Sequence, residues 1–140
     1  MQKLAEGTTR EVYLNVETGL VHKLQKSCRR EYANMNEVLI WEAVKGTSKE
    51  KHFLPVLSWD KYKREIVVPF SEDVEAKDLQ SQDMIPVYWE DRFLHNLGWY
   101  KGRVVIRDYG DMSLTDLHYW GEASRYIWVT DEEADECYSY

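Results

Sequence analysis

The sequence predicts a single α+β domain built from antiparallel hairpins and one main helix. Three patterns carry this prediction: apolar and polar residues alternate over residues 10–16, helix-forming residues fill 31–45, and a Lys101-Gly102 turn separates two short apolar runs. A chain of 140 residues buries one core of ordinary size, so we expect no second independent core.

The first predicted elements are a hairpin and a helix. Residues 10–16 and 20–24 read as two short strands that flank the turn Glu17-Thr-Gly19. Residues 31–45 then consist mostly of good helix formers, and Gly46 follows as a stop signal. The pattern predicts a hairpin followed by one helix of about four turns.

Two further strands and a connection complete the first half of the chain. Residues 53–57 and 65–70 are apolar runs on either side of a polar turn at 60–64, which predicts a strand on each side. The composition becomes acidic and polar over residues 71–83, so we expect a hinge or surface connection there.

The second half is predicted to hold a helix, a hairpin and terminal helical segments. Pro86 can occupy an early helical position, so residues 84–93 are expected to form a helix. Residues 97–106 form a hairpin around its Lys-Gly turn. The terminal helical segments carry Trp120 and Trp128, and we expect these large aromatic side chains to pack internally.

Charge is unevenly divided along the chain. Residues 1–70 hold 12 Lys and Arg against 9 Asp and Glu, whereas residues 71–140 hold 6 against 16, which gives net charges of +3 and −10. The acidic half would repel a phosphate backbone, so direct binding of DNA or RNA is disfavoured. The acidic run over residues 131–136 is typical of a solvated surface.

The composition predicts a cytoplasmic protein with no membrane segment, and a bacterial or infected-cell cytoplasm is the default expectation. The longest apolar runs are only as long as a strand, and the first residues lack the apolar segment of a secretory signal. Cys28 and Cys137 lie far apart without metal-ligand spacing, which favours two reduced thiols over a disulfide.

Two polar motifs flank the hairpin predicted over residues 97–106. Asp91 and Asn96 precede it, and Asp108-Tyr-Gly110 begins twelve residues after Asn96. Magnesium prefers hard oxygen ligands and usually takes one or two of them from protein. The amide oxygen of Asn96 and the carboxylate of Asp108, at opposite ends of one hairpin, are therefore a candidate magnesium site.

Five short motifs follow one another over residues 4–110: Gly7-Thr-Thr-Arg10-Glu-Val12-Tyr13, Val21-His-Lys23-Leu24, Asn34-Met-Asn-Glu37-Val-Leu-Ile-Trp41, Asp91-Arg-Phe-Leu-His-Asn96 and Asp108-Tyr-Gly110. In this order and spacing they resemble the motifs of the protein kinase-like superfamily, and in particular those of its very small members from bacteriophages and bacteria.

The resemblance implies a compact kinase-like fold that binds ATP with Mg²⁺. Its parts would be an antiparallel-sheet N-lobe with one helix over residues 1–70, a hinge over 71–83 and a strongly reduced C-lobe over 84–140. The implied activity is transfer of a phosphoryl group to a hydroxyl acceptor.

The resemblance also implies a role for each matching residue. These roles are a phosphate-loop glycine at Gly7, catalytic residues at Lys23 and Asp91, a partner for the lysine at Glu37, and magnesium ligands at Asn96 and Asp108. Asp91 would orient or deprotonate the acceptor hydroxyl, and Lys23 would bind phosphate oxygens.

The partner of Lys23 is open on spacing alone. A lysine drawn out of water keeps its proton only when an anion holds its charge, so a nearby carboxylate is expected. Glu37 shares a helical stripe with apolar residues, but Glu31 and Glu42 also face apolar neighbours. All three remain candidates, with Glu37 matching the motif.

Two other functions stay open. The loop has a single glycine, Gly7, and Trp89-Glu90 stands before Asp91 in place of His-Arg, which favours a kinase-like protein that lacks catalysis and binds a host protein. The net charge of the second half suggests a weaker alternative, an acidic mimic of nucleic acid that blocks a DNA-binding protein.

Overall fold

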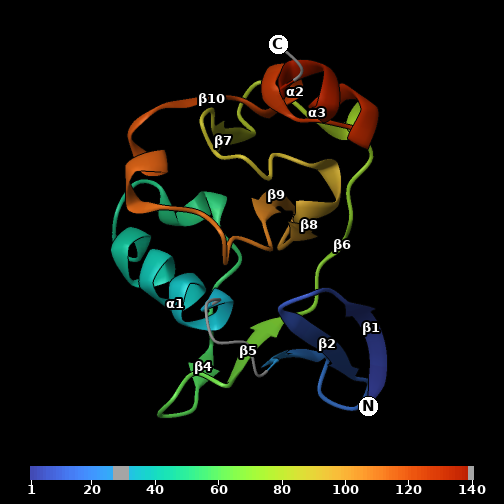
Figure 1. Cartoon of the computed structure of the whole chain (residues 1–140), viewed down its shortest axis with the longest axis vertical. Coiled ribbons are helices and arrows are strands. Elements are labelled where there is room, and N and C mark those ends of the chain that lie inside the picture. Colours follow the sequence, from blue (N-terminus) through green and yellow to red (C-terminus); the bar gives the residue numbers. More distant parts are fainter. Residues whose placement is uncertain (27–31, 139–140) are drawn as a thin grey trace.

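Three antiparallel sheets and a few short helices form the described part of the protein, residues 1–26 and 32–138 of the computed structural model (Figure 1). The predicted class, α+β with antiparallel strands, is confirmed. Within this part of the chain, no helix combines the length and apolar character needed to cross a bilayer. Cys28 and the side chain of Cys137 lie outside the described residues, so their reduced state stays a prediction.

The largest sheet has five strands in the order β1-β2-β3-β5-β4. They are β1 (Gln2–Glu6), β2 (Arg10–Asn15), β3 (Leu20–Gln25), β4 (Ser58–Trp59) and β5 (Glu65–Pro69). The hairpin of β2 and β3 confirms the predicted one, and its register pairs Lys23 with Val12. β1 was not predicted because all its residues are exposed, so it lacks the alternation that reveals a half-buried strand.

The helix α1 (Ala33–Val44) confirms the main predicted helix over its described residues and contacts β3. Its start is tied to the sheet by Asn34, whose amide Nδ2 donates to the backbone oxygens of Lys23 and Arg64, each at 3.0 Å. After α1 the chain turns at Gly46, which has a positive φ of 81°.

The predicted hairpin over residues 97–106 is confirmed as β8 (Leu97–Tyr100) and β9 (Arg103–Ile106). Lys101 and Gly102 both have positive φ, 49° and 77°, as a two-residue turn of type I′ requires. A third strand, β6 (Glu72–Asp73), pairs with β8. The connection over residues 71–83 therefore also extends this sheet and includes one short helix, η2 (Ala76–Asp78).

The predicted strand over residues 53–57 is wrong. A single 3-10 turn, η1 (Glu50–His52), leads into an irregular segment whose Leu54 N–H donates to the oxygen of Ile106 at 2.9 Å. Three residues later, Leu57 N–H donates to the oxygen of Val67 at 2.8 Å. The segment bridges β9 and β5, and this burial between two sheets explains its strand-like apolar composition.

The predicted helix over residues 84–93 is also wrong. β7 (Met84–Pro86) pairs instead with β10 (Trp120–Glu122), a segment predicted to be helical. Ile85 and Trp89 are fully buried, so long-range packing decides the conformation here.

Short elements complete the second half of the chain. They are η3 (Leu94–Asn96), η4 (Leu114–His118), α2 (Ala123–Tyr126) and α3 (Asp131–Tyr138). Trp128 follows α2, is buried and forms a backbone bridge with Phe93. Trp120 is partly buried with its ring centroid 5.7 Å from that of Phe53, so internal packing of both tryptophans is confirmed.

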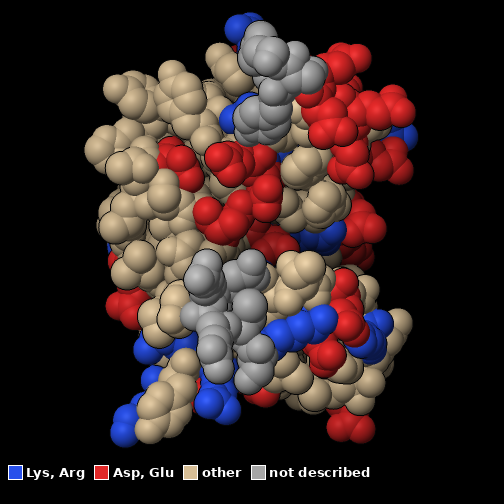
Figure 2. Space-filling view, viewed as in Figure 1, with Lys and Arg blue, Asp and Glu red and all other residues tan. Residues whose placement is uncertain are grey.

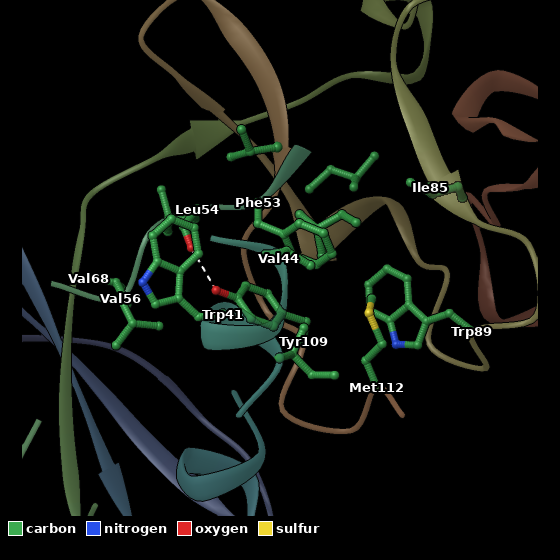
Figure 3. Close-up of a cluster of buried hydrophobic side chains, with 14 of the residues drawn as sticks. Trp41, Val44, Phe53, Leu54, Val56, Val68, Ile85, Trp89, Tyr109 and Met112 are labelled. Carbon is green, nitrogen blue, oxygen red and sulfur yellow. Dashed lines mark hydrogen bonds between the residues drawn. The ribbon is translucent and has the colours of Figure 1, made fainter. Parts of the chain in front are cut away.

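The core joins the five-stranded sheet and α1 to the second half of the chain. Figure 3 shows Trp41 and Val44 of α1 beside Phe53, Leu54 and Tyr109. The Tyr109 hydroxyl donates to the backbone oxygen of Leu54 at 2.8 Å, the dashed line of Figure 3. This buried anchor fixes the position of the residues on either side of Tyr109.

The charge asymmetry of the sequence is visible on the surface. In the view of Figure 2, Asp and Glu side chains gather at the upper right over α3, where Asp131, Glu132 and Glu133 are exposed. Lys and Arg side chains are more prominent in the lower part, which carries the five-stranded sheet (Figures 1 and 2).

We expect Gly110→Ala to lower the free energy of unfolding by about 1–3 kcal/mol, because added core atoms force a backbone shift. A Cβ at Gly110 would lie 2.7 Å from the backbone oxygen of Ala33 in α1. Urea unfolding measures the change. Gly7→Ala is the matched control, since a Cβ at Gly7 meets no atom within 4 Å. Equal stabilities of the two variants would contradict the packing of residue 110 on α1.

Candidate functional site

The centre of the candidate site is the carboxylate of Glu37, whose side chain has no exposed surface. Its Oε2 accepts a hydrogen bond from Lys23 Nζ at 2.8 Å. Its Oε1 accepts from both terminal nitrogens of Arg10 at 3.3 Å and from the backbone N–H of Tyr109 at 3.1 Å. Two cations and one amide dipole thus offset the cost of burying this charge.

The prediction that Glu37 pairs with Lys23 is confirmed. Lys23 is only 5% exposed and also donates to the backbone oxygen of Arg107 at 2.8 Å. Glu42 is exposed on the other side of α1, and Glu31 lies outside the described residues. The pairing follows from geometry: β3 and α1 are adjacent, and Lys23 and Glu37 face each other between them.

Arg10 is a site residue that the sequence did not predict. It is the first residue of β2, is 7% exposed, and its guanidinium bonds to Glu37, Asp108 and the Asn34 side-chain oxygen. A buried guanidinium requires anions because it does not deprotonate. The signal available in the sequence was the position of Arg10 in the same motif as Gly7, but no role was assigned to Arg10.

Asp108 lies at the open side of this network. Its side chain is 50% exposed, in contrast to the enclosed Glu37. Partial burial of the carboxyl works against its charge, but the positive charges of Lys23 and Arg10 outweigh that effect and lower the pKa of Asp108 below its ordinary value. The residue is therefore a carboxylate at neutral pH, held by Arg10 and facing the cavities described below.

Asn96 is locked in place through its amide nitrogen. Nδ2 donates to the backbone oxygen of Asp91 at 2.9 Å, and the backbone oxygen of Asn96 accepts from Arg107 N–H at 2.9 Å. These bonds tie the stretch between Asp91 and Asn96 to the end of β9, next to Asp108. Because Nδ2 is engaged, the oxygen Oδ1 is the atom of this amide suited to bind a cation.

Two cavities meet at Asn96 and Asp108, which line both. The first, of about 560 Å³, has apolar walls and a polar end; among its lining residues are Val12, Val21, Leu54, Val68 and Lys23. The second, of about 590 Å³, has a more polar lining that includes Gly7, Thr8, Thr9, Arg10, Asp91 and Asp111. Together they make one cleft with an apolar end and a polar end.

The structure brings all the sequence-predicted site residues to this cleft. Lys23 lines the first cavity, Gly7 and Asp91 line the second, and Glu37 lies behind them as the partner of Lys23. Gly7 N–H donates to the oxygen of Arg10 at 2.9 Å, which closes the turn between β1 and β2. The roles of these residues stay predictions, since their positions show proximity and not chemistry.

A second acidic residue, Asp111, accompanies Asp91 in the second cavity. Burial and a hydrogen bond with the Asp91 carboxylate raise the pKa of Asp111 to about 7, although Trp89 Nε1 donates to its Oδ1 at 3.1 Å and works in the opposite direction. A carboxyl group beside another carboxylate is harder to ionise, which adds to the effect of burial on Asp111. The sequence reasoning had not singled out Asp111.

Asn96 and Asp108 carry oxygen donors of the kind that magnesium binds. Among the described side chains, those of residues 1–26 and 32–136, there is no group of three or more His, Cys, Asp and Glu arranged to hold a metal ion. Asn96 and Asp108 would supply one amide oxygen and one carboxylate, and water or phosphate oxygens would have to complete the shell of a magnesium ion. One oxygen of Asp108 is held by Arg10, which a cation would have to displace or share.

No protein-family model matches this chain, and no curated protein matches it significantly.

Glu37→Gln is expected to lower the free energy of unfolding by about 3–5 kcal/mol, because Lys23 and Arg10 would lose their shared buried counter-ion. Chemical denaturation gives the value. The matched control is Glu42→Gln, the same substitution at an exposed position of α1, which should change stability by less than about 0.5 kcal/mol. Similar losses in both variants would show that the buried network is not what stabilises the protein.

The pKa of Asp111 predicts a pH dependence of stability. Since the folded state raises this pKa from 3.8 to about 7, folding binds a proton, and the free energy of unfolding should fall as pH rises through this window. Asp111→Asn should remove that fall, measured by urea unfolding at a series of pH values. Asp135→Asn, at an exposed position of α3, should retain it. Parallel pH curves for the wild type and Asp111→Asn would refute the assignment.

Proposed function

We propose that this protein is a minimal kinase-like nucleotide-binding protein that takes ATP together with Mg²⁺ in the joined cavities. The observation that carries the proposal is the buried pair of Lys23 and Glu37, placed beside an apolar cavity that ends at Asn96 and Asp108. The motifs that supply these residues are those that resemble kinases, and they converge although they are spread over much of the chain.

The proposed architecture assigns the five-stranded sheet and α1, residues 1–70, to an N-lobe. Residues 71–83 are the connection, and residues 84–140 form a strongly reduced C-lobe. The cleft lies between these parts, since its lining comes from residues on both sides of the connection. This assignment accounts for the position of Ser71 and Glu72 at the edge of the first cavity.

The first cavity suits the base of a nucleotide. Its volume of about 560 Å³ is within the usual range for small-molecule sites, and its walls are apolar side chains of β2, β3 and β5. A flat heteroaromatic ring gains from leaving water for such walls. Polar groups gather at the other end, where phosphates would lie.

At the polar end, Lys23 would bind phosphate oxygens while Glu37 keeps the lysine charged and aimed. Asn96 and Asp108 would hold the magnesium ion, which supplies charge neutralisation between phosphate groups. These roles need only positioned side chains, and the contacts of Glu37 and Asn96 show how firmly the protein positions them.

Transfer of a phosphoryl group to a hydroxyl acceptor extends this proposal. Asp91 borders the second cavity, where an acceptor would enter, and its backbone is fixed by Asn96. A general base must reach the hydroxyl that it deprotonates, and Asp91 lines the cavity that would receive the acceptor.

One observation favours a second candidate, a kinase-like protein without turnover that binds a bacterial host protein. Arg10 holds a carboxylate that the first proposal needs for magnesium. A phosphotransfer assay with ATP and generic protein and small-molecule acceptors separates the two, because both candidates share the scaffold and only the first transfers phosphate.

Calorimetry with ATP, with and without Mg²⁺, tests nucleotide binding. We expect the wild type to bind ATP in the presence of Mg²⁺, and we expect Asp108→Asn and Lys23→Met each to weaken the Kd by at least about tenfold, or about 1.4 kcal/mol. Asp135→Asn removes the same charge as Asp108→Asn, but on α3, and should bind as the wild type does. If neither the wild type nor Asp108→Asn binds ATP, the proposal fails.

A further inference from the structure

Arg10 is a buried cation that borders an open cavity. Its side chain is 8% exposed, yet it lines the second cavity together with Thr8 and Thr9. Burial alone would oppose its charge, but the charges of Glu37 and Asp108 outweigh that effect and raise the pKa of Arg10. The guanidinium therefore stays positively charged, and its charge is balanced by these two carboxylates.

The two anions that hold Arg10 differ in access. Glu37 has no exposed surface and is also bound by Lys23, so no ligand can replace it. Asp108 is half exposed and lines both cavities, so a solute can reach it. Of the partners of Arg10, Asp108 is therefore the exchangeable one.

The balance of charges determines which ligand can replace Asp108 as the partner of Arg10. In the described network, the cations Lys23 and Arg10 are matched by the anions Glu37 and Asp108. A divalent cation that binds Asp108 alone would leave the cluster with excess positive charge, and an anion that binds Arg10 alone would compete with Asp108. A cation and a phosphate that arrive together satisfy both, because a guanidinium pairs readily with phosphate oxygens in a two-bond geometry.

We propose that Arg10 is a second phosphate-binding residue of the cleft, which releases Asp108 to a divalent cation as it binds a phosphate group, so that polyphosphate and metal bind cooperatively. This inference rests on the proposed function and adds to it a residue and a coupling. The short turn after β1 has Gly7 as its one glycine and offers few backbone N–H groups to a phosphate. The side chain of Arg10 then provides a phosphate contact in their place.

Other charges around the second cavity limit where the phosphate binds. Glu6 and Asp91 also line this cavity and repel an anion, and Asp111 adds to this repulsion when it is ionised. The phosphate must therefore lie toward Arg10 and Asp108, where the metal offsets the nearby carboxylates. This placement puts the bound group between the two cavities, near Lys23.

The test is calorimetry with inorganic tripolyphosphate in EDTA, with MgCl₂ alone, and with premixed magnesium tripolyphosphate. For the wild type we expect the magnesium complex to bind at least about tenfold more tightly than tripolyphosphate alone. Arg10→Met should weaken binding of the complex by about tenfold or more and bind MgCl₂ alone more tightly than the wild type does. The affinity of Arg10→Lys for the magnesium complex should lie between those of the wild type and Arg10→Met.

Arg64→Met is the matched control, because Arg64 is exposed and lines a cavity elsewhere on the sheet. It removes the same charge and should bind all three solutes as the wild type does. The inference would be overturned if Arg10→Met bound the magnesium complex as tightly as the wild type does. An equal loss of affinity in Arg64→Met would also overturn it.

A measurement on the wild type covers the case in which Arg10→Met does not fold. With ¹⁵N-labelled arginine, magnesium tripolyphosphate should shift the side-chain resonance of Arg10 and leave those of Arg64 and Arg125 unchanged. An unchanged Arg10 resonance at saturation would overturn the inference.

The two proposals fail separately. If tripolyphosphate binding depends on Arg10 while ATP does not bind, the inference about Arg10 stands and nucleotide binding fails. If ATP binding requires Lys23 but not Arg10, nucleotide binding stands and the inference about Arg10 is overturned.

Discussion

A carboxylate with no access to water, that of Glu37, is the constraint on which this structure depends. Its donors come from β3, from β2 and from the backbone after β9. An unpaired buried carboxylate is prohibitively costly, so the sheet, α1 and the segment around Tyr109 must assemble together. The cleft follows from this requirement, since the interactions that satisfy Glu37 also bring Asp108 beside Arg10.

Much of the fold could be predicted where a local pattern decided the structure. The hairpin of β2 and β3, α1 and the hairpin of β8 and β9 have short-range signals, including the Lys101-Gly102 turn with its positive φ angles. The predictions failed where contacts with a segment distant in the sequence determine the conformation. Residues 53–57 are apolar because they lie between two sheets, and residues 84–86 are extended because β10 pairs with them.

The candidate site shows the same division. Lys23 and Glu37 could be paired from sequence because a motif set their order, and the distance between them agrees. Arg10 was missed because an arginine near the start of a strand is usually a surface residue, and only the three-dimensional structure shows two carboxylates around it. Asp111 was missed because its raised pKa comes first from burial and then from a hydrogen bond with Asp91, twenty positions earlier in the chain.

The irregular segment between the sheets limits how the cleft can move. Leu54 is hydrogen-bonded to the strand β9 and Leu57 to β5, so a link of a few residues ties the two sheets together at the cleft, where Leu54 lines the first cavity. Separating the two sheets would require breaking one of these backbone hydrogen bonds or extending the short link between them. A ligand that fills the cleft while both bonds stay formed orders no further backbone in this segment, which reduces the conformational entropy lost on binding.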